Sequence, residues 1–284
     1  MNVKKFFFVF FLTPSICVFA DTEHDELLDE TRKFKFADPE LDKLLDEAQK
    51  LKEKGEEDDA VDAYKDILKK YDLTLLDKTI LLDIRKYLAY YYYSNKKYPE
   101  AQKYFALLVR DSSIKGDELQ DAVYKLCLSI YSKLPSRAEV DLRKCYELRN
   151  AVNTFSKYVG DRKILNHMNK MCKEALSLVD EQKCLFVEYY FDKGQYPQAL
   201  YLCNKYLMDM RDEVYIKRLL VLKLKTLTVL REFKNYVLFI KFFDVIKKQY
   251  TNIYSSSQKE FSDLYSEFIQ TWERRREKMR KMKK

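Results

Sequence analysis

The side chains that most often carry catalysis are few in this sequence. It has 2 histidines, His24 and His167, and 6 cysteines, with no Cys-x-x-Cys pair. A general base is most often a histidine, and a structural zinc site needs Cys or His at close spacing. The 4 glycines form no Walker loop, GxGxxG or GxSxG motif. We therefore expect no enzymatic activity, no metal site and no cofactor.

The cysteines fit a different role, as small apolar residues on helices. Cys17 lies in the apolar N-terminal segment, which leaves five others: Cys127, Cys145, Cys172, Cys184 and Cys203. Because five is odd, a complete set of disulfides is excluded. A reduced cysteine packs as a small hydrophobic side chain, so we expect most of the five in the core.

The elements that would position these side chains are predicted to be helices. Among 284 residues there are only 4 Gly and 5 Pro, while 35% are charged and Tyr and Phe number 23 and 18. Sheet proteins need many more Gly, Pro and Asn residues at their turns, whereas Leu, Lys and Glu favour helices. The composition therefore predicts an all-α fold.

Two of the 5 prolines occur in matching phrases, Tyr98-Pro99-Glu100-Ala101 and Tyr196-Pro197-Gln198-Ala199. Proline is favoured at the first position of a helix, where its missing N–H would have no partner. We expect each phrase to open the second helix of a hairpin, after a turn of the kind that Gly55 and Gly194 permit. A spacing of small residue, Ala and apolar residue recurs as Ala48–Ala60–Tyr64, Ala89–Ala101–Phe105 and Val187–Ala199–Cys203.

This spacing resembles the tetratricopeptide repeat, which implies a right-handed solenoid of about five helix pairs. Two less regular pairs are predicted, 117–133 with 149–158 and 214–230 with 235–248, and residues 134–148 form an insertion in the first. A last helix should cap the final pair with five apolar side chains, Phe261, Leu264, Tyr265, Phe268 and Ile269. The predicted boundaries are a signal peptide at 1–20, an acidic linker at 21–38, the repeat domain at 39–253 and a basic helix at 254–284.

The first twenty residues have the order of a secretory signal. Lys4 and Lys5 precede an apolar run at 6–12, and Val18-Phe19-Ala20 predicts cleavage before Asp21. Cys17 leaves two interpretations open. It is either removed with the signal or is the lipid attachment site of a lipoprotein, although Ile16 stands where such signals need a small residue.

Charge is unevenly placed along the chain. Residues 21–62 carry 17 acidic and 7 basic side chains, whereas the last thirteen residues, 272–284, carry 8 basic and 2 acidic ones. Solvated helix faces explain such a pattern. The second interpretation is attraction of the basic end to an acidic partner surface or to anionic lipid headgroups. Since no RRM, KH or zinc-finger pattern occurs, we expect no binding to nucleic acid.

Two stretches resemble repeats of the BamD (YfiO/ComL) family of outer-membrane assembly factors. RNAVNTFSKYVGD, residues 149–161, resembles the third-repeat helix, and FVEYYFDKGQYPQAL, residues 186–200, resembles the fourth repeat. The resemblance runs from about Pro39 to Lys248. It implies a periplasmic scaffold on the inner face of the outer membrane, anchored by lipid or peripheral. It also implies that this scaffold binds the POTRA region of a barrel protein, other assembly-machine subunits and unfolded outer-membrane proteins.

The resemblance also assigns residues. The fourth repeat would bind the POTRA-containing partner through Glu188, Tyr189, Tyr190, Lys193 and Tyr196, with Glu188 and Lys193 as exposed charges. The first repeats would form a groove for unfolded substrates with Leu44, Ala48, Tyr64, Tyr90 and Tyr92, and one or two of the tyrosines 90–93 should face outward. The first alternative is a generic exported repeat scaffold for cell-envelope or division proteins. The second, which needs a different interpretation of the N-terminus, is a cytoplasmic or eukaryotic secretory repeat protein.

Overall fold

The computed structural model describes residues 38–71, 76–138, 141–230 and 233–282. Regular structure in these ranges consists of α-helices and one 3-10 helix, with no strand, so the predicted all-α class is confirmed. The chain divides into two compact units, 1–84 and 85–284, and the division falls within helix α4, Lys78–Ser94. The predicted signal, its cleavage site before Asp21 and Cys17 lie outside the described residues.

The first unit contains the helix pair α2, Pro39–Lys54, and α3, Glu57–Lys70. Pro39 occupies the first turn of α2, and the carboxylate of Asp38 caps that helix by accepting a hydrogen bond from the Glu40 amide at 3.0 Å. Ala48 and Ala60 are both fully buried, because small side chains let the two helices approach closely.

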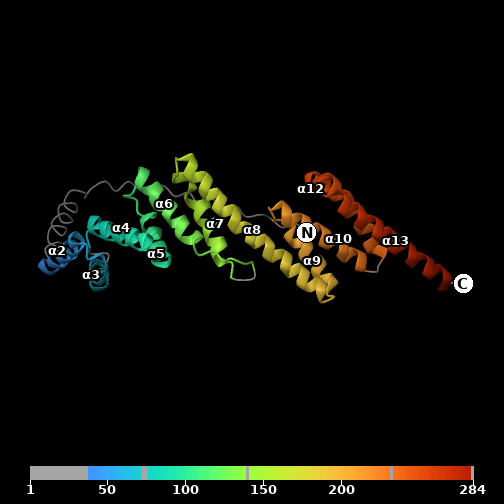
Figure 1. Ribbon diagram of the computed structural model, residues 1–284, viewed down its shortest axis with the longest axis horizontal. Helices are drawn as coiled ribbons and strands as arrows, with labels where there is room; N and C mark the ends of the chain where they lie inside the picture. The colour runs from blue at the N-terminus through green and yellow to red at the C-terminus, as the bar shows by residue number, and fades with distance from the viewer. Residues whose placement is uncertain (1–37, 72–75, 139–140, 231–232, 283–284) are drawn as a thin grey trace, which may run out of the picture. The chain divides into compact units, whose positions relative to one another are not determined.

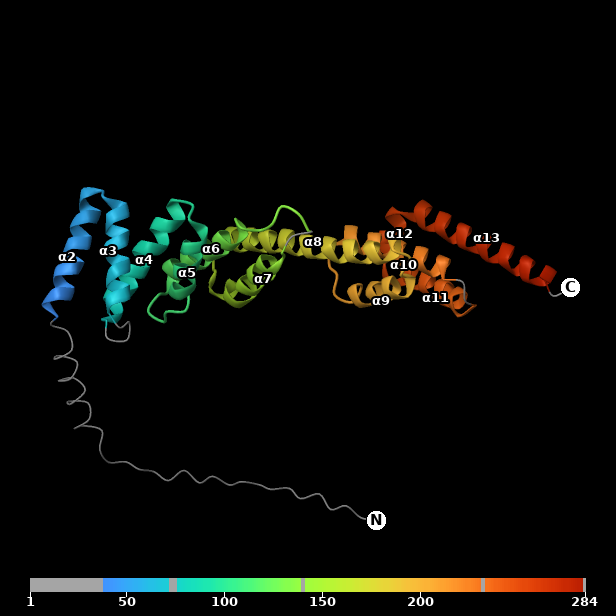
Figure 2. The same ribbon diagram turned by 90° about the horizontal axis from the view of Figure 1, so that it is seen from below.

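In the second unit, helices that follow one another in the chain pack against each other (Figure 1, Figure 2). After α4 come α5, Tyr98–Leu108; α6, Gly116–Tyr131; α7, Arg143–Phe155; the 3-10 helix η1, Ser156–Tyr158; α8, Arg162–Asp192; α9, Tyr196–Tyr206; α10, Glu213–Val229; α11, Phe233–Gln249; α12, Thr251–Ser256; and α13, Gln258–Met282. Helix α8 also contacts α6 and α10, its second neighbours.

Three hairpin turns share one hydrogen-bond pattern. In the α2–α3 turn the Gly55 amide donates to the Lys52 carbonyl at 3.1 Å, and the next amide, of Glu56, donates to the Leu51 carbonyl at 3.0 Å. The α4–α5 and α8–α9 turns repeat both bonds. The residue in the left-handed conformation is Gly55 at φ 78°, Lys96 at φ 56° and Gly194 at φ 72°. The glycines were predicted to lie in such turns, and Lys96 adopts the same conformation without being a glycine.

One predicted boundary is wrong. Helix α7 begins at Arg143, so the last six residues of the predicted insertion at 134–148 are helical. They carry apolar residues at helical spacing, and Cys145 and Leu148 are fully buried. Helix α8 is one continuous helix of 31 residues, and its last part, from Phe186, forms the first helix of the predicted fourth repeat.

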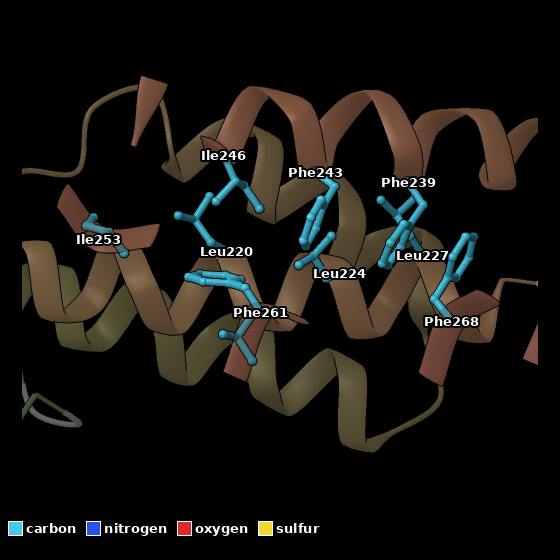
Figure 3. Close-up of a cluster of buried hydrophobic side chains, with 10 residues drawn as sticks. Leu220, Leu224, Leu227, Phe239, Phe243, Ile246, Ile253, Phe261 and Phe268 are labelled. Atoms are coloured by element: carbon cyan, nitrogen blue, oxygen red, sulfur yellow. The ribbon is translucent and has the colours of Figure 1, made fainter. Parts of the chain in front are cut away.

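The C-terminal helices close one end of the second unit with an apolar cluster (Figure 3). Phe239 of α11 and Phe268 of α13 stack with ring centroids 3.6 Å apart, and Leu227 of α10 lies against them in Figure 3. Phe261 is fully buried, and Leu264, Tyr265 and Ile269 pack against the cluster. The five predicted side chains of the last helix therefore do cover α10 and α11.

Candidate partner-binding surface

Helix α8 positions the residues predicted to bind a partner, and its two halves have different neighbours. Its first half is tied to α6, where His167 Nδ1 and Tyr124 Oη are hydrogen-bonded at 2.6 Å. Its second half packs on α9 and α10 through Cys184 and Val187, which are fully buried. A helix of 31 residues is about 46 Å long at the usual rise, enough to span two helix pairs.

One stripe of α8 changes from buried to exposed where the neighbours change. Met168, Met171 and Ala175 are buried in the first half and lie at i, i+3 and i+7. The same spacing continues through Gln182, Phe186, Tyr189 and Lys193, the C-cap residue that follows the last turn of α8, and we call these four residues the α8 stripe. Phe186 is 50% exposed and Tyr189 is 57% exposed. The stripe is thus the continuation of a packing face that has lost its neighbouring helices.

Tyr189 and Lys193 are both exposed, as a partner-binding role would require, and that role stays a prediction. Lys193 is exposed, and its Nζ lies 5.9 Å from the centroid of the Tyr189 ring. A cation near an aromatic face gains about 0.5–1 kcal/mol at an exposed site and restricts both side chains. Phe186 belongs with them but was not predicted. The signal was its i−3 spacing from Tyr189 in a segment without Gly or Pro.

Glu188 is an interhelix contact rather than an exposed charge. Its two carboxylate oxygens accept from Nε and Nη2 of Arg218 on α10, at 2.6 and 2.5 Å. The Glu188 carboxylate raises the pKa of Arg218, chiefly through these hydrogen bonds. The expectation that Glu188 is an exposed surface charge is wrong, because the pair holds α8 to α10.

Tyr190 and Tyr196 are half-buried, so each packs against neighbouring side chains and also keeps part of its surface accessible. Tyr190 packs against the cluster between α8, α9 and α10, and its ring meets that of Tyr189 edge-on at 5.4 Å. Tyr196 begins α9, and its ring packs edge-on against Phe191 with centroids 5.4 Å apart. Both contacts fix the α8–α9 hairpin.

Most of the residues predicted to form a substrate groove lie in the core. Ala48 is fully buried, Tyr64 is 7% exposed and Tyr92 is 6% exposed, so these three have almost no surface to offer a ligand. Tyr92 stacks on Tyr104 of α5 with centroids 5.8 Å apart. Leu44 is half-buried on α2. The prediction that these residues line a groove is wrong for Ala48, Tyr64 and Tyr92.

Tyr90 belongs to a set of polar contacts between alternate helices that we did not predict. We call this set the polar ladder. It joins α4 to α6 and α6 to α8 through Lys86–Glu118, Tyr90–Asp121, Tyr124–His167 and Tyr131–Glu174. Burial, followed by the hydrogen bond to Asp121, raises the pKa of Tyr90. Of the tyrosines 90–93 none is exposed, contrary to the expectation that one or two face outward.

The described residues contain no cluster of three or more His, Cys, Asp or Glu side chains able to hold a metal ion. Burial raises the pKa of Cys127, Cys184 and Cys203 to about 12, so these thiols are protonated and unreactive near neutral pH. The exposed side chains of the α8 stripe are suited to binding rather than to bond making.

The described helices include none that is both long enough and apolar enough to span a membrane. No protein-family model and no curated protein matches this chain.

Proposed function

We propose that the chain is a non-enzymatic scaffold that binds other proteins through a right-handed tetratricopeptide solenoid. The observation that carries this proposal is the repetition of one hairpin. In three helix pairs the motif positions Ala48 and Ala60, Ala89 and Ala101, and Val187 and Ala199 are all fully buried. The turns that join the two helices of each pair share the same two hydrogen bonds. Stacked hairpins of this kind expose extended surfaces on which protein segments bind.

The proposed partner is the POTRA region of an outer-membrane barrel protein, as the resemblance to the BamD family implies. In this proposal the scaffold is exported and lies on the periplasmic face of the outer membrane, and it also receives unfolded outer-membrane proteins. The partner surface is the α8 stripe, since Phe186 and Tyr189 supply exposed aromatic area next to the Lys193 charge. Exposed aromatic side chains are the usual anchors of protein interfaces.

A charge reversal in the stripe tests the proposal. Lys193→Glu should weaken capture of the POTRA-containing barrel, because a reversed charge at an interface meets the partner's complementary charge with repulsion. Folding should be unaffected, since an exposed charge contributes little to stability. Lys163→Glu, an exposed lysine on the first half of the same helix, is the matched control.

Co-purification of each folded variant from cell envelopes gives the result. Loss of the barrel with Lys193→Glu and its retention with Lys163→Glu would support the assignment. Capture that is equal for both variants would place the interface elsewhere. A peptidoglycan-associated protein in place of the barrel would favour the generic envelope scaffold. Glu188→Lys is unsuitable here because it also breaks the Arg218 contact.

A further inference from the structure

A cavity of about 750 Å³ lies between the start of α11 and the C-terminal part of α13. Tyr236 of α11 and Trp272 of α13 stack in its wall with ring centroids 4.9 Å apart and an interplanar angle of 29°. Arg275, Arg276 and Met279 of α13 line it as well. Its lining therefore combines an aromatic pair with guanidinium groups, a combination that the packing of α13 on α11 does not require.

Helix α13 extends past the helix on which it packs. Phe268 stacks on Phe239, and one turn further along α13 Trp272 stacks on Tyr236, so the two helices run in opposite directions. Helix α11 begins at residue 233, so less than one turn remains to cover α13 beyond Trp272. Accordingly Met279 is 47% exposed and Met282 is 80% exposed, although both continue the apolar face of α13.

This extension is strongly basic. Residues 273–282 carry six cations, Arg274, Arg275, Arg276, Lys278, Arg280 and Lys281, against the carboxylates of Glu273 and Glu277. Within the described part of the chain none of the six forms an ion pair. Arg275 and Arg276 follow Trp272 at i+3 and i+4 and so share its side of the helix. Glu273 is the single carboxylate in the cavity lining.

We propose that this end of α13 binds the surface of an anionic phospholipid membrane. Trp272, Tyr236 and Met279 would lie at the boundary between headgroups and acyl chains, where amphipathic aromatic side chains are favoured. The guanidinium groups of Arg275 and Arg276 can each donate two hydrogen bonds to a lipid phosphate. The proposal is independent of the protein partner assigned to α8.

The arrangement of the cations favours a lipid surface over an acidic peptide. Arg274 and Lys281 lie at i and i+7, on a different side of the helix from Arg275 and Arg276. A peptide in the cavity would reach Arg275, Arg276 and Lys278, which line it, but not Arg274 or Lys281. A helix is about 10 Å wide, close to the Debye length at physiological ionic strength. An extended anionic surface therefore attracts all six.

Trp272 provides a local readout, because it is the only tryptophan in the chain. The purified full chain would be mixed with vesicles of phosphatidylcholine alone or with phosphatidylglycerol added. We expect Trp272 emission to move to shorter wavelength with the anionic vesicles only, and the shift to disappear at high salt. Emission is preferred to total binding, since the apolar run at 6–12 could bring the chain to vesicles by itself.

Two variants with equal change in net charge decide the assignment. Arg275→Glu with Arg276→Glu should weaken vesicle binding, read from Trp272, by at least about tenfold, given about 1 kcal/mol for each basic residue near an anionic surface. Lys163→Glu with Lys170→Glu, both exposed on α8, should leave it much less changed.

Several results would overturn the proposal. They are no shift of Trp272 emission with anionic vesicles, an equal emission shift with phosphatidylcholine alone, or an unchanged affinity of the Arg275 and Arg276 variant for anionic vesicles. A shift with polyglutamate but not with vesicles would assign the site to an acidic polypeptide instead.

Discussion

The polar ladder and the C-terminal apolar cluster join helices of the same unit in opposite ways. In the polar ladder, tyrosine hydroxyls and a lysine contact carboxylates or a histidine two helices further along the chain, from α4 to α6 and from α6 to α8. Most of these polar side chains remain partly exposed. In the cluster of α10, α11 and α13, the contacts are buried aliphatic groups and stacked rings, and Phe239 is fully buried. Both regions contain aromatic side chains. In the polar ladder their hydroxyl groups form hydrogen bonds, whereas in the apolar cluster their rings stack.

The difference follows from where the helices lie in the second unit. Helices such as α6 and α8 have neighbouring helices on both sides that complete their apolar core, so the polar ladder only fixes how they lie against each other. The pair α10–α11 is instead covered by the single helix α13, which packs its apolar face against them. Polar contacts near water contribute little to the free energy of unfolding, whereas burial of apolar side chains contributes much. Substitutions should therefore have unequal effects in the two regions.

The largest effect is expected for Phe239→Ala in the apolar cluster. Removing a fully buried ring that stacks on Phe268 should lower the free energy of unfolding by about 3–5 kcal/mol. Phe186→Ala makes the same chemical change at a site that is 50% exposed and should leave stability nearly unchanged. Urea denaturation of both variants measures the difference, and equal losses would contradict the buried role of Phe239.

Lys223 places one charge in the apolar region, and its removal should stabilise the protein. Its Nζ lies 3.5 Å from the centroid of the Phe242 ring, and burial lowers its pKa from 10.5 to about 8. The folded chain thus binds this proton less tightly than the unfolded chain does, which penalises folding fully below pH 8. Lys223→Met should raise the free energy of unfolding at pH 7 by about 1–3 kcal/mol.

The pH dependence gives the check. Between pH 8 and 10.5 folded wild type has released the Lys223 proton and the unfolded chain has not, so wild-type stability rises relative to the variant. The gain from Lys223→Met should therefore shrink across this window in denaturation curves measured at several pH values. A gain that does not change with pH would mean that the charge of Lys223 is not the cause.

A smaller effect is expected in the polar ladder. Tyr90→Phe removes the hydroxyl that donates to Asp121 and keeps the ring packed against Phe105. We expect a loss of about 1 kcal/mol in the free energy of unfolding, the usual net contribution of one hydrogen bond. Tyr93→Phe, one turn along the same helix, is the control and should have less effect. A loss as large as that of Phe239→Ala would remove the contrast between the two regions.

The smallest effect tests the turn before α5. Lys96→Gly should raise stability by up to about 1 kcal/mol, because a residue with a Cβ is strained at φ 56° and glycine is not. Gly194→Ala should have the opposite sign. A Cβ at position 194 would meet no atom within 4 Å beyond the two adjacent residues, so only the backbone conformation opposes it. Opposite shifts in melting temperature would confirm that the two turns are equivalent.

Features encoded by short-range rules could be predicted from the sequence. Prolines at helix starts, Gly55 and Gly194 in the turns and the capping face of α13 all depend on spacing within one or two helices, and the structure agrees with them. The left-handed conformation of Lys96 in the turn before α5 was not predicted, because the hairpin imposes it against the residue's own preference.

Features that depend on pairing between distant residues could not be predicted. Glu188 and Arg218 are 30 residues apart, and nothing in the local sequence distinguishes Glu188 from an exposed helix charge. The same holds for Tyr90 and Asp121, 31 residues apart. The α8 stripe is an intermediate case. Its spacing is visible in the sequence, but its exposure depends on where α6 and α7 end.

The central claim is that the α8 stripe binds a partner protein, and site-specific photo-cross-linking in intact envelopes tests it most directly. A photoreactive phenylalanine derivative would replace Tyr189, and, as a control, Tyr158, which is 44% exposed on η1. We predict a cross-link to a POTRA-containing barrel protein from position 189 and none from position 158. Cross-links to that protein from position 158 alone, or from neither position, would contradict the account.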